Sequence, residues 1–272
     1  MMSVDFKAVA DSMRTEGKDN QGVRVDSASV RKVISLFTSA VFPGRIDDSP
    51  LDQTLAELYY DIREISSGIV TESTPEAIAL SFIKMLPSLK SSVLSDVKAI
   101  FDADPAAKSP DEIILCYPSV KAMLHYRLAH ALLTLGLPLI PRMITEFAHS
   151  ETGIDIHPGA RIGDYFSIDH GTGVVIGETA IVGDHVRIYQ GVTLGAKSFR
   201  HDENGKAISG PRHPVIEDNV TIYSNSSILG RITIGHDSVI GGNVWQTESL
   251  PPFSRVVQGK SLATHFTDGG GI

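Results

Sequence analysis

Residues 156–191 read, in groups of six, IHPGAR IGDYFS IDHGTG VVIGET AIVGDH VRIYQG. Each group begins with an aliphatic residue, and Val192 begins the next group. The rule lapses between 195 and 214 and resumes in the same phase at Ile216, after which every sixth residue up to Ile240 is again aliphatic. Because only 42% of the chain is hydrophobic, twelve such positions in one phase indicate a genuine repeat.

A period of six predicts a short strand followed by a turn, repeated many times, because helices have a period of 3.6 and long strands a period of 2. Hexapeptide repeats build a parallel β-helix in which three strands close one triangular turn, and successive turns stack about 4.8 Å apart. Twelve repeats predict about four turns. We expect the aliphatic residue of each repeat inside the prism. Small residues two places earlier suit its narrow interior: Ala160, Thr172, Ser226 and Ser238.

The chain before residue 153 has the hydrophobic pattern of helices. Apolar residues spaced by three and four predict helices over 30–42, 51–65, 75–86, 88–101, 119–135 and 139–149, with Ser27 or Ser29, Thr74 and Ser119 as N-caps. Pro87 is expected to kink or restart the chain between the third and fourth of these helices.

The fold class predicted by these two patterns is α+β, an all-helical domain followed by a parallel β-helix. We place the helical domain at 1–152, with roughly the first 25 residues partly disordered. The β-helix occupies 153–252, where a long loop at 196–212 interrupts it, and 253–272 form a tail.

Composition excludes several classes of partner. A net charge of −8 and a pI near 5.6 argue against nucleic acid. Residues 1–13 lack the apolar segment of a secretory signal, and the longest apolar stretch, 129–141, is too short to span a membrane. A single cysteine, Cys116, excludes an internal disulfide and suits a reducing compartment. We therefore expect a cytoplasmic protein without membrane contact, with Cys116 buried as a small hydrophobe.

Departures from the repeat are the candidate functional positions, because the interior of the prism is too narrow for a substrate. In SIDHGTG, Asp169 and His170 follow an inward Ile168, and a histidine can remove a proton from a hydroxyl when a carboxylate supports the imidazolium. Asp155 precedes His170 by fifteen residues, close to one turn, so stacking could bring the two together. Arg212 and His213 return the long loop to the coil, and from the residues alone they are as well explained as loop anchors.

The motifs DIHPGARIG, IDHGTGVVIGETA, QGVTLG and RHP, in this order and after a helical domain, resemble the serine O-acetyltransferases of the hexapeptide-repeat acyltransferase superfamily. The resemblance covers about 88–252. It implies a left-handed coil, an exception to the usual right-handed crossover. It also implies transfer of the acetyl group of acetyl-CoA to the hydroxyl of L-serine, which gives O-acetyl-L-serine and CoA. This is the first step of cysteine biosynthesis, and inhibition by cysteine at the serine site is implied with it.

The same resemblance implies roles for individual residues. His170 matches the general base and Asp155 its dyad partner, and the hydroxyl attacks the thioester directly in a ternary complex. The substrate-binding positions are Asp104 and Asp169 for the amine, and Arg212, with His213 beside it, for the carboxylate. An amino acid zwitterion needs both kinds of partner.

Acetyl-CoA is expected along the groove between neighbouring coils, and no metal is implied. The matching positions are Thr193, Gly195, Ala196, Ser224 and Gly242, with Lys197, Lys206, Arg255 and Lys260 as candidate phosphate partners. Two features depart from the family pattern in this region. The loop 197–210 is longer than usual and follows Ala196 in place of a glycine, and Pro211 stands where an aspartate is common.

The resemblance further implies a homotrimer or a dimer of trimers, with active sites shared between neighbouring subunits. Members of this type end in a tail with a terminal isoleucine that enters the active site of O-acetylserine sulfhydrylase, and this chain ends in Ile272. An ordinary disordered end is the alternative reading of that tail.

Three other functions stay open at this point. Another hydroxyl could accept the acetyl group, such as that of homoserine or a sugar, although the acidic pair and Arg212 favour an amino acid. A zinc lyase of the γ-carbonic anhydrase kind shares this coil and uses three histidines across a subunit interface. The histidines available for it are His157, His170, His185 and His213. The third alternative is a non-catalytic regulator that binds the sulfhydrylase through the tail.

Overall fold

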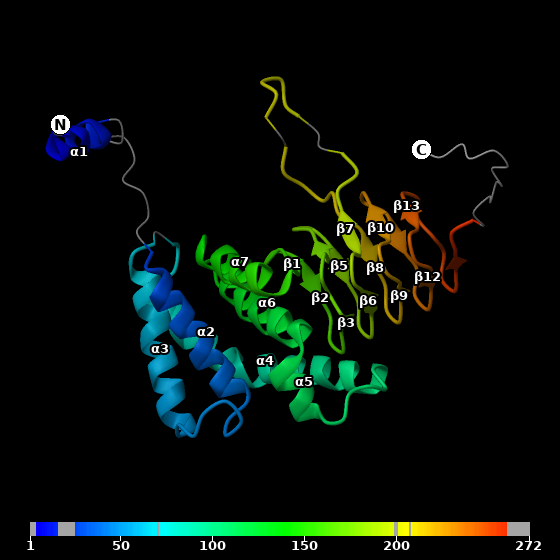
Figure 1. Cartoon of the computed structure of the whole chain (residues 1–272), viewed down its shortest axis with the longest axis horizontal. Helices are drawn as coiled ribbons and strands as arrows, with labels where there is room; N and C mark the ends of the chain where they lie inside the picture. Colours follow the sequence, from blue (N-terminus) through cyan, green and yellow to red (C-terminus); the bar gives the residue numbers. More distant parts are fainter. Residues whose placement is uncertain (1–3, 16–24, 70, 199–200, 207, 260–272) are drawn as a thin grey trace.

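The computed structural model describes residues 4–15, 25–69, 71–198, 201–206 and 208–259, and it has the predicted α+β architecture. Helices gather at one end and a coil of short strands extends from them (Figure 1). The helices are α1 (Phe6–Thr15), α2 (Ser27–Val41), α3 (Leu51–Ser67), α4 (Pro75–Ala103), α5 (Pro110–Cys116), α6 (Pro118–Thr134) and α7 (Ile140–Thr152).

The coil is a triangular prism with one parallel sheet on each side. Sheet A consists of β1 (Asp155–Ile156), β4 (Val175–Ile176), β7 (Thr193–Gly195), β10 (Ser227–Leu229) and β13 (Trp245–Gln246). Sheet B consists of β2 (Arg161–Ile162), β5 (Ile181–Val182), β8 (Val215–Ile216) and β11 (Thr233–Ile234). Sheet C consists of β3 (Ser167–Asp169), β6 (Arg187–Tyr189), β9 (Thr221–Ile222), β12 (Val239–Ile240) and β14 (Arg255–Val256). We name the corners AB, BC and CA by the sheets that they join.

The coil is longer than the sequence predicts. Its sheets hold five, four and five strands, so it makes about five turns and not four. The aliphatic period ends at Ile240, but β13 pairs with β10 and β14 pairs with β12. Leu250 forms an isolated bridge to Ile234 that continues sheet B. The coil therefore reaches at least Val256, beyond the predicted boundary at 252.

One turn of the coil contains two extra residues. Ile168 pairs with Ile188 and Ile176 pairs with Leu194, so the step from β3 to β4 is eight residues where the step from β6 to β7 is six. After the insertion, the inward residues of the strands are Ile176, Val182, Ile188 and Leu194. The residues two places before them are also buried and aliphatic: Val174, Ala180, Val186 and Val192. The period of six in the sequence passes from the inward positions to these earlier positions at the insertion, so the sequence shows no break.

The helical domain differs from its prediction at one proline and at one N-cap. The segments 75–86 and 88–101 form the single helix α4, which passes through Pro87. The proline is exposed, so water can satisfy the carbonyl that loses its N–H partner. The cap of α2 is Asp26, which accepts from the N–H groups of Ala28 and Ser29, and not Ser27 or Ser29.

Three further differences concern short or terminal segments. Helix α1 forms within the segment expected to be partly disordered, and α5 was not predicted. Helix α6 begins at Pro118 without a side-chain cap, so Ser119 does not have the predicted role. Cys116 ends α5 and is exposed, which corrects the prediction that it is buried.

Helices α4 and α6 join the helical domain to the coil. Arg127 of α6 donates two hydrogen bonds to Asp96 of α4, at 2.7 and 2.8 Å, and a third to the carbonyl of Gly163 in the coil. Asp96 also accepts from the N–H of Phe166. Tyr126, beside Arg127, donates to the carbonyl of Ala160 and lies in the hydrophobic core of the coil. The first turn of the coil is therefore attached to the helices by buried polar contacts.

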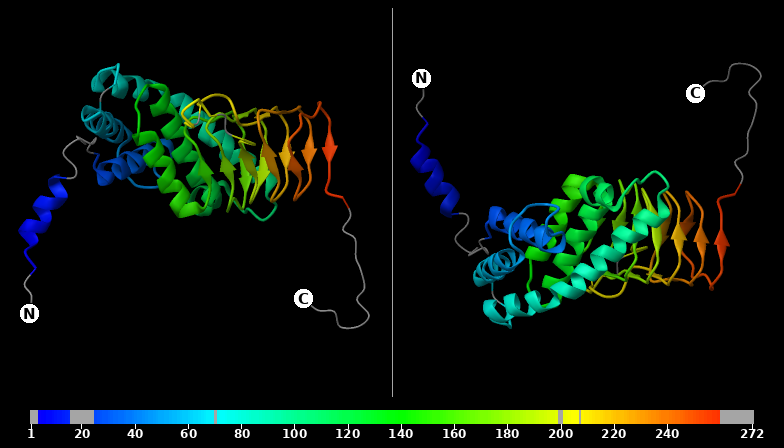
Figure 2. Two further views of the ribbon diagram at one scale, coloured as in Figure 1. Left: turned by 90° about the horizontal axis from the view of Figure 1, so that it is seen from above. Right: turned by 90° about the horizontal axis from the view of Figure 1, so that it is seen from below.

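Among the described residues, α4 alone matches a membrane span in length and composition, with a mean hydropathy of 1.3 over its most apolar 18-residue window. It packs against α3, α5, α6 and β3, and it carries the buried Asp96 in the pair with Arg127. Of that window, 28% is buried inside the structure. In Figure 2, α4 runs beside the first turns of the coil, and its C-terminal end lies against sheet C.

Candidate active site

His170 lies in the two-residue insertion of the coil. Asp169 pairs with Tyr189 of the next turn. The carbonyl of Thr172 accepts from the N–H of Gly191, just as the carbonyl of Gln190 accepts from Asn225 one turn later, so Thr172 corresponds to Gln190. His170 and Gly171, between Asp169 and Thr172, therefore have no counterpart in the next turn. His170 has a φ of +57° and its side chain is 76% exposed. The insertion thus pushes an imidazole out of corner CA, where a regular repeat would keep the backbone in the stack.

Asp104 and Asp169, predicted to bind the substrate amine, are brought together from the two domains. Asp104 follows α4, and Asp169 ends β3 against which α4 packs. Nε2 of His170 lies 3.8 Å from Oδ1 of Asp169. A shallow pocket at this place is lined by both carboxylates, by Tyr117 and by Arg187.

Hydrogen bonds hold Asp104 in its ionised form. The hydroxyl of Tyr117 donates to it at 2.6 Å and the N–H of Ala106 at 2.8 Å. These bonds, together with the charges of His170 and Arg187, lower the pKa of Asp104, while the same carboxylate raises the pKa of Tyr117 to about 12. His170 and Arg187 thus lie near enough to Asp104 to act on its charge.

Arg187 is a member of this site that the sequence analysis did not identify. It lies on β6 and donates to Asp169 at 3.0 Å and to the carbonyl of Ala103 at 3.1 Å. Its only sequence signal was its position next to an inward isoleucine, which places it on the outer face of sheet C.

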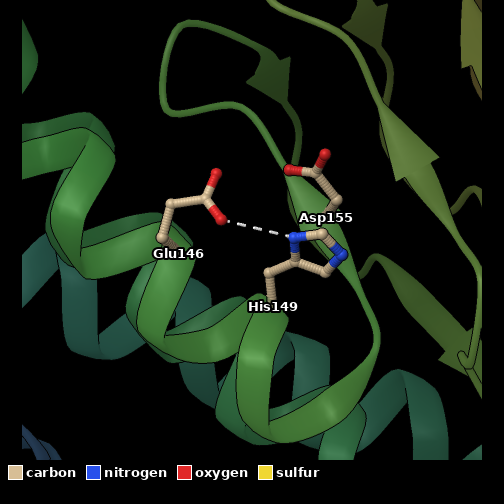
Figure 3. A group of neighbouring side chains, drawn as sticks. All are labelled: Glu146, His149 and Asp155. Carbon is tan, nitrogen blue, oxygen red and sulfur yellow. Dashed lines mark hydrogen bonds and ion pairs between the residues drawn. The ribbon is translucent and has the colours of Figure 1, made fainter.

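The structure does not pair Asp155 with His170 within the described residues. Asp155 instead accepts from Arg142 of α7 at 3.3 Å, and Arg142 also forms an ion pair with Glu146. In Figure 3 the side chains of Glu146, His149 and Asp155 face one another, with a hydrogen bond between the first two. Their ligand atoms are close enough to surround a cation, but Arg142 already neutralises two of the three residues, so the group is an ion-pair cluster.

Arg212 and His213 lie at corner AB, where the long loop returns to the coil. Arg212 donates to Glu178 at 2.5 Å and to the carbonyl of Gly210, so it anchors the loop end and also presents a cation. Residues 201–206 of the loop extend away from the coil (Figure 1).

His213 is buried and its tautomer is fixed. Its Nδ1 accepts from the backbone N–H of Thr179 at 3.0 Å, so the neutral ring carries its proton on Nε2. Burial, with a further contribution from Arg212, lowers the pKa of His213 to about 4. The ring lies against the Cα of Gly177, where an added Cβ would come within 2.1 Å of ring atoms.

The predicted site residues form two groups at opposite edges of sheet A. His170, Asp169 and Asp104 are at corner CA, and Arg212 and His213 are at corner AB. No hydrogen bond or ion pair joins the two groups in the part of the chain that the structure describes. Of the histidines considered for zinc, His157 and His213 are at corner AB, His185 at corner BC and His170 at corner CA.

The predicted acetyl-CoA positions follow one side of the coil. Thr193 and Gly195 belong to β7 of sheet A, and Ala196 follows β7. Ser224 and Gly242 stack at corner CA, where a Cβ on Gly242 would lie 3.3 Å from the carbonyl of Ser224. Lys197 and Arg212 line a pocket beneath the long loop together with Arg231. The predicted partner residue Ile272 and the candidate Lys260 lie outside the described residues.

Comparison with known proteins agrees with this architecture. A family model described as bacterial transferase hexapeptide (six repeats) matches residues 213–245. A solved serine acetyltransferase from Brucella abortus, in complex with coenzyme A, is 28% identical and covers 84% of this chain and 78% of its own, with a TM-score of 0.62.

Two other relatives are closer in sequence. The crystal structure of serine acetyltransferase isoform 3 from Entamoeba histolytica, in complex with cysteine, is 34% identical with a TM-score of 0.76, covering 87% of this chain and 84% of that one. A plasmid serine acetyltransferase of Synechococcus elongatus is 51% identical over 252 residues, which are 88% of this chain and 78% of the relative. A helical domain fused to a hexapeptide coil, with this degree of identity over most of both chains, means that the chain belongs to the serine O-acetyltransferase family of hexapeptide-repeat acyltransferases.

Proposed function

We propose that this chain transfers the acetyl group of acetyl-CoA to the hydroxyl of L-serine with His170 as the general base. The observation that supports this role most directly is the exposed imidazole at corner CA, beside two carboxylates contributed by different domains. Asp104 and Asp169 suit the ammonium group of an amino acid, which would place a β-hydroxyl near His170. A sugar or a simple alcohol has no charge for these carboxylates.

The reaction needs no covalent enzyme intermediate. The serine oxygen attacks the carbonyl carbon of the thioester while its proton passes to His170. The tetrahedral intermediate then expels the CoA sulfur, which takes the proton back from the imidazolium, so His170 ends the cycle neutral. Backbone N–H groups beside the thioester would stabilise the oxyanion.

Asp155 would support the imidazolium as the dyad partner of His170. In the structure its carboxylate is engaged by Arg142. The dyad therefore requires the Asp155 carboxylate to turn toward corner CA when substrates bind, and Arg142 would lose one of its two acidic partners in that step.

A trimer would complete the serine site. The amine partners and the carboxylate partner Arg212 lie at different corners of the prism, so corner AB of one subunit must approach corner CA of another to surround one zwitterion. A cyclic trimer makes this contact three times with the same pair of surfaces. A dimer of trimers is compatible with the same arrangement.

Acetyl-CoA would lie along sheet A and corner CA, next to Thr193, Gly195, Ala196, Ser224 and Gly242. The Brucella relative was solved with coenzyme A, and the small side chains at these positions leave room for a pantetheine arm. We further propose that the reaction serves cysteine biosynthesis and that cysteine inhibits it at the serine site, since the Entamoeba relative was solved with cysteine.

Thiol release from acetyl-CoA, with L-serine, L-homoserine and a simple sugar as alternative acceptors, tests the proposed function. Turnover with serine alone is the expected result. His170→Ala should reduce kcat by at least about a hundredfold while coenzyme A still binds, because a general base contributes a factor of this size. Retention of about a tenth of the rate would refute the role of His170.

The C-terminal tail is a separate proposal that concerns residues outside the described part. Deletion of Ile272 should abolish co-purification with O-acetylserine sulfhydrylase and leave acetyl transfer unchanged. Unaltered co-purification would refute it.

A further inference from the structure

Arg187 occupies a position from which one side chain reaches both domains. It points outward from β6 between two short side chains of the same sheet, Ser167 on β3 and Thr221 on β9. These neighbours leave its guanidinium free to extend toward the C-terminal end of α4. That end carries Asp104, and the last residue of β3 is Asp169.

One nitrogen of Arg187 connects the two acidic segments. Nη2 donates to Oδ2 of Asp169 at 3.0 Å and to the carbonyl of Ala103 at 3.1 Å. Ala103 is the last residue of α4 and directly precedes Asp104. The distance between the two carboxylates therefore depends on this guanidinium.

The contact also determines which oxygen of Asp169 is available. Oδ2 is taken by Arg187, whereas Oδ1 faces Nε2 of His170 at 3.8 Å. An ammonium group that enters the pocket would therefore meet Oδ1 of Asp169 and the carboxylate of Asp104. Without Arg187 the Asp169 side chain could rotate and present either oxygen.

Charge leads to the same conclusion. Asp104 and Asp169 carry two negative charges, so an ammonium group alone leaves one uncompensated, and Arg187 supplies the second positive charge. The other titratable groups near the guanidinium are Tyr189, whose ring it lies over, and Tyr117, which lines the same pocket and is bonded to Asp104. His170 acts on the charge of Asp104. Loss of the cation would leave two carboxylates facing each other and would favour protonation of one of them.

Aromatic rings support the guanidinium from its own face of the coil. Its central carbon lies 4.8 Å from the ring centre of Tyr189, and that ring stacks on Tyr223 at 4.8 Å. A cation over an aromatic face is both attracted and restricted in orientation. Nε of Arg187 is buried without a hydrogen-bond partner among the described residues, which costs free energy. The side chain keeps this position through the two hydrogen bonds of Nη2.

We propose that Arg187 is a positioning residue of the acceptor site, which sets the spacing and orientation of Asp104 and Asp169 so that together they bind one ammonium group. The inference rests on the proposed function, because it assigns the two carboxylates to the substrate amine. It adds a residue that acts on the substrate through Asp169 and the end of α4.

Steady-state kinetics of Arg187→Gln and Arg187→Lys test the proposal against Arg161→Gln, which removes an exposed outward arginine from β2. Arg187→Gln should raise the KM for L-serine about tenfold or more, the size expected for loss of a charge-assisted hydrogen bond. The KM for acetyl-CoA should change less than about twofold, because no proposed CoA contact is touched. Arg187→Lys should recover part of the loss, and Arg161→Gln should resemble the wild type.

The pH profile separates positioning from simple structural support. In Arg187→Gln the acidic limb of kcat/KM for L-serine should move to higher pH, because two unscreened carboxylates hold a proton more readily than one. An unchanged limb and KM for serine would overturn the proposal. Equal increases in both KM values with a lowered Tm would also overturn it, since they indicate general loosening. If the wild-type protein does not turn over serine, the proposed function fails, and calorimetric binding of L-serine to the same variants then decides the role of Arg187.

Discussion

His213 shows how closely one residue of the coil can depend on another. Its ring occupies the space where any side chain on Gly177 would begin, and its Nδ1 is bonded to Thr179 two residues further on. The returning end of the long loop therefore packs on a turn where only glycine leaves room for the His213 ring. Arg212 is next to His213, so its position depends on the same contacts.

Gly177→Ala should displace the ring of His213 and with it Arg212. We expect a loss of about 1–3 kcal/mol in the free energy of unfolding, the usual cost of overpacking, and a rise in the KM for L-serine. Urea unfolding and steady-state kinetics would measure both. Gly259→Ala is the control, because Gly259, like Gly177, does not have a positive φ and an added Cβ there meets nothing within 4 Å. Wild-type kinetics in Gly177→Ala would contradict this account.

The pKa of His213 makes stability depend on pH. Its folded pKa of about 4 lies below the ordinary value of 6.5, so the unfolded chain binds a proton more readily across this interval. The free energy of unfolding should therefore fall as pH is lowered from 6.5 to about 4 and be fully retained above 6.5. Urea midpoints across this range should decline less in His213→Asn. His185→Asn, at an exposed corner, should keep the wild-type slope, and equal slopes in all three proteins would contradict the prediction.

At the scale of elements, a buried ion pair joins α4 to α6, and water cannot reach either side chain to solvate it if the partner is removed. Asp96 and Arg127 are both buried, and Asp96→Ala would leave the guanidinium without its carboxylate. We expect a loss of about 3–5 kcal/mol. Lys98→Ala on the same helix breaks an exposed pair with Asp102 and should cost less than about 1 kcal/mol. Denaturant unfolding compares the two, and similar costs would refute the assignment.

The strands could be predicted from the sequence because the interior of the coil accepts only one kind of side chain at each step. The insertion of His170 and Gly171 could not, because aliphatic residues occupy two positions per repeat and the period continues from one to the other. Helix ends were predicted less well. Pro87 interrupts the hydrophobic pattern without interrupting α4, since its exposed position allows water to replace a backbone partner.

The candidate site was predictable to a similar extent. Motifs identified His170, Asp104 and Asp169, and the structure brings these three together. They did not identify Arg187 or Arg142, because a charged residue on the outer face of a coil reads as solvated until its neighbours are known. Both arginines bind carboxylates that the sequence had assigned to other partners.

At the scale of the whole molecule, the separation of corner AB from corner CA predicts complementation between inactive subunits. His170→Ala and Arg212→Ala should each be nearly inactive alone. In mixed trimers some sites combine an intact corner CA from one subunit with an intact corner AB from its neighbour. Each mixed trimer, whichever variant it contains twice, should regain one of its three sites, or about a third of the wild-type activity.

Co-expression with two different tags, followed by tandem purification, would isolate the mixed trimers for assay. A mixture of His170→Ala with itself under both tags is the control. Failure of mixed trimers to recover activity would mean that each subunit carries its own complete site, and the proposed trimeric arrangement would be wrong.

The two residues inserted at His170 and Gly171 make the coil usable as a ruler. Turns follow one another at about 4.8 Å, so the number of the turn that contains an insertion fixes how far along the axis a side chain is displayed. Most enzymes set the position of a reactive group through loops of variable path. In this coil its position along the axis changes only in steps of one whole turn. Transfer of these two residues to the next turn would move the reactive side chain by about 4.8 Å along the axis and leave the other turns of the scaffold in place.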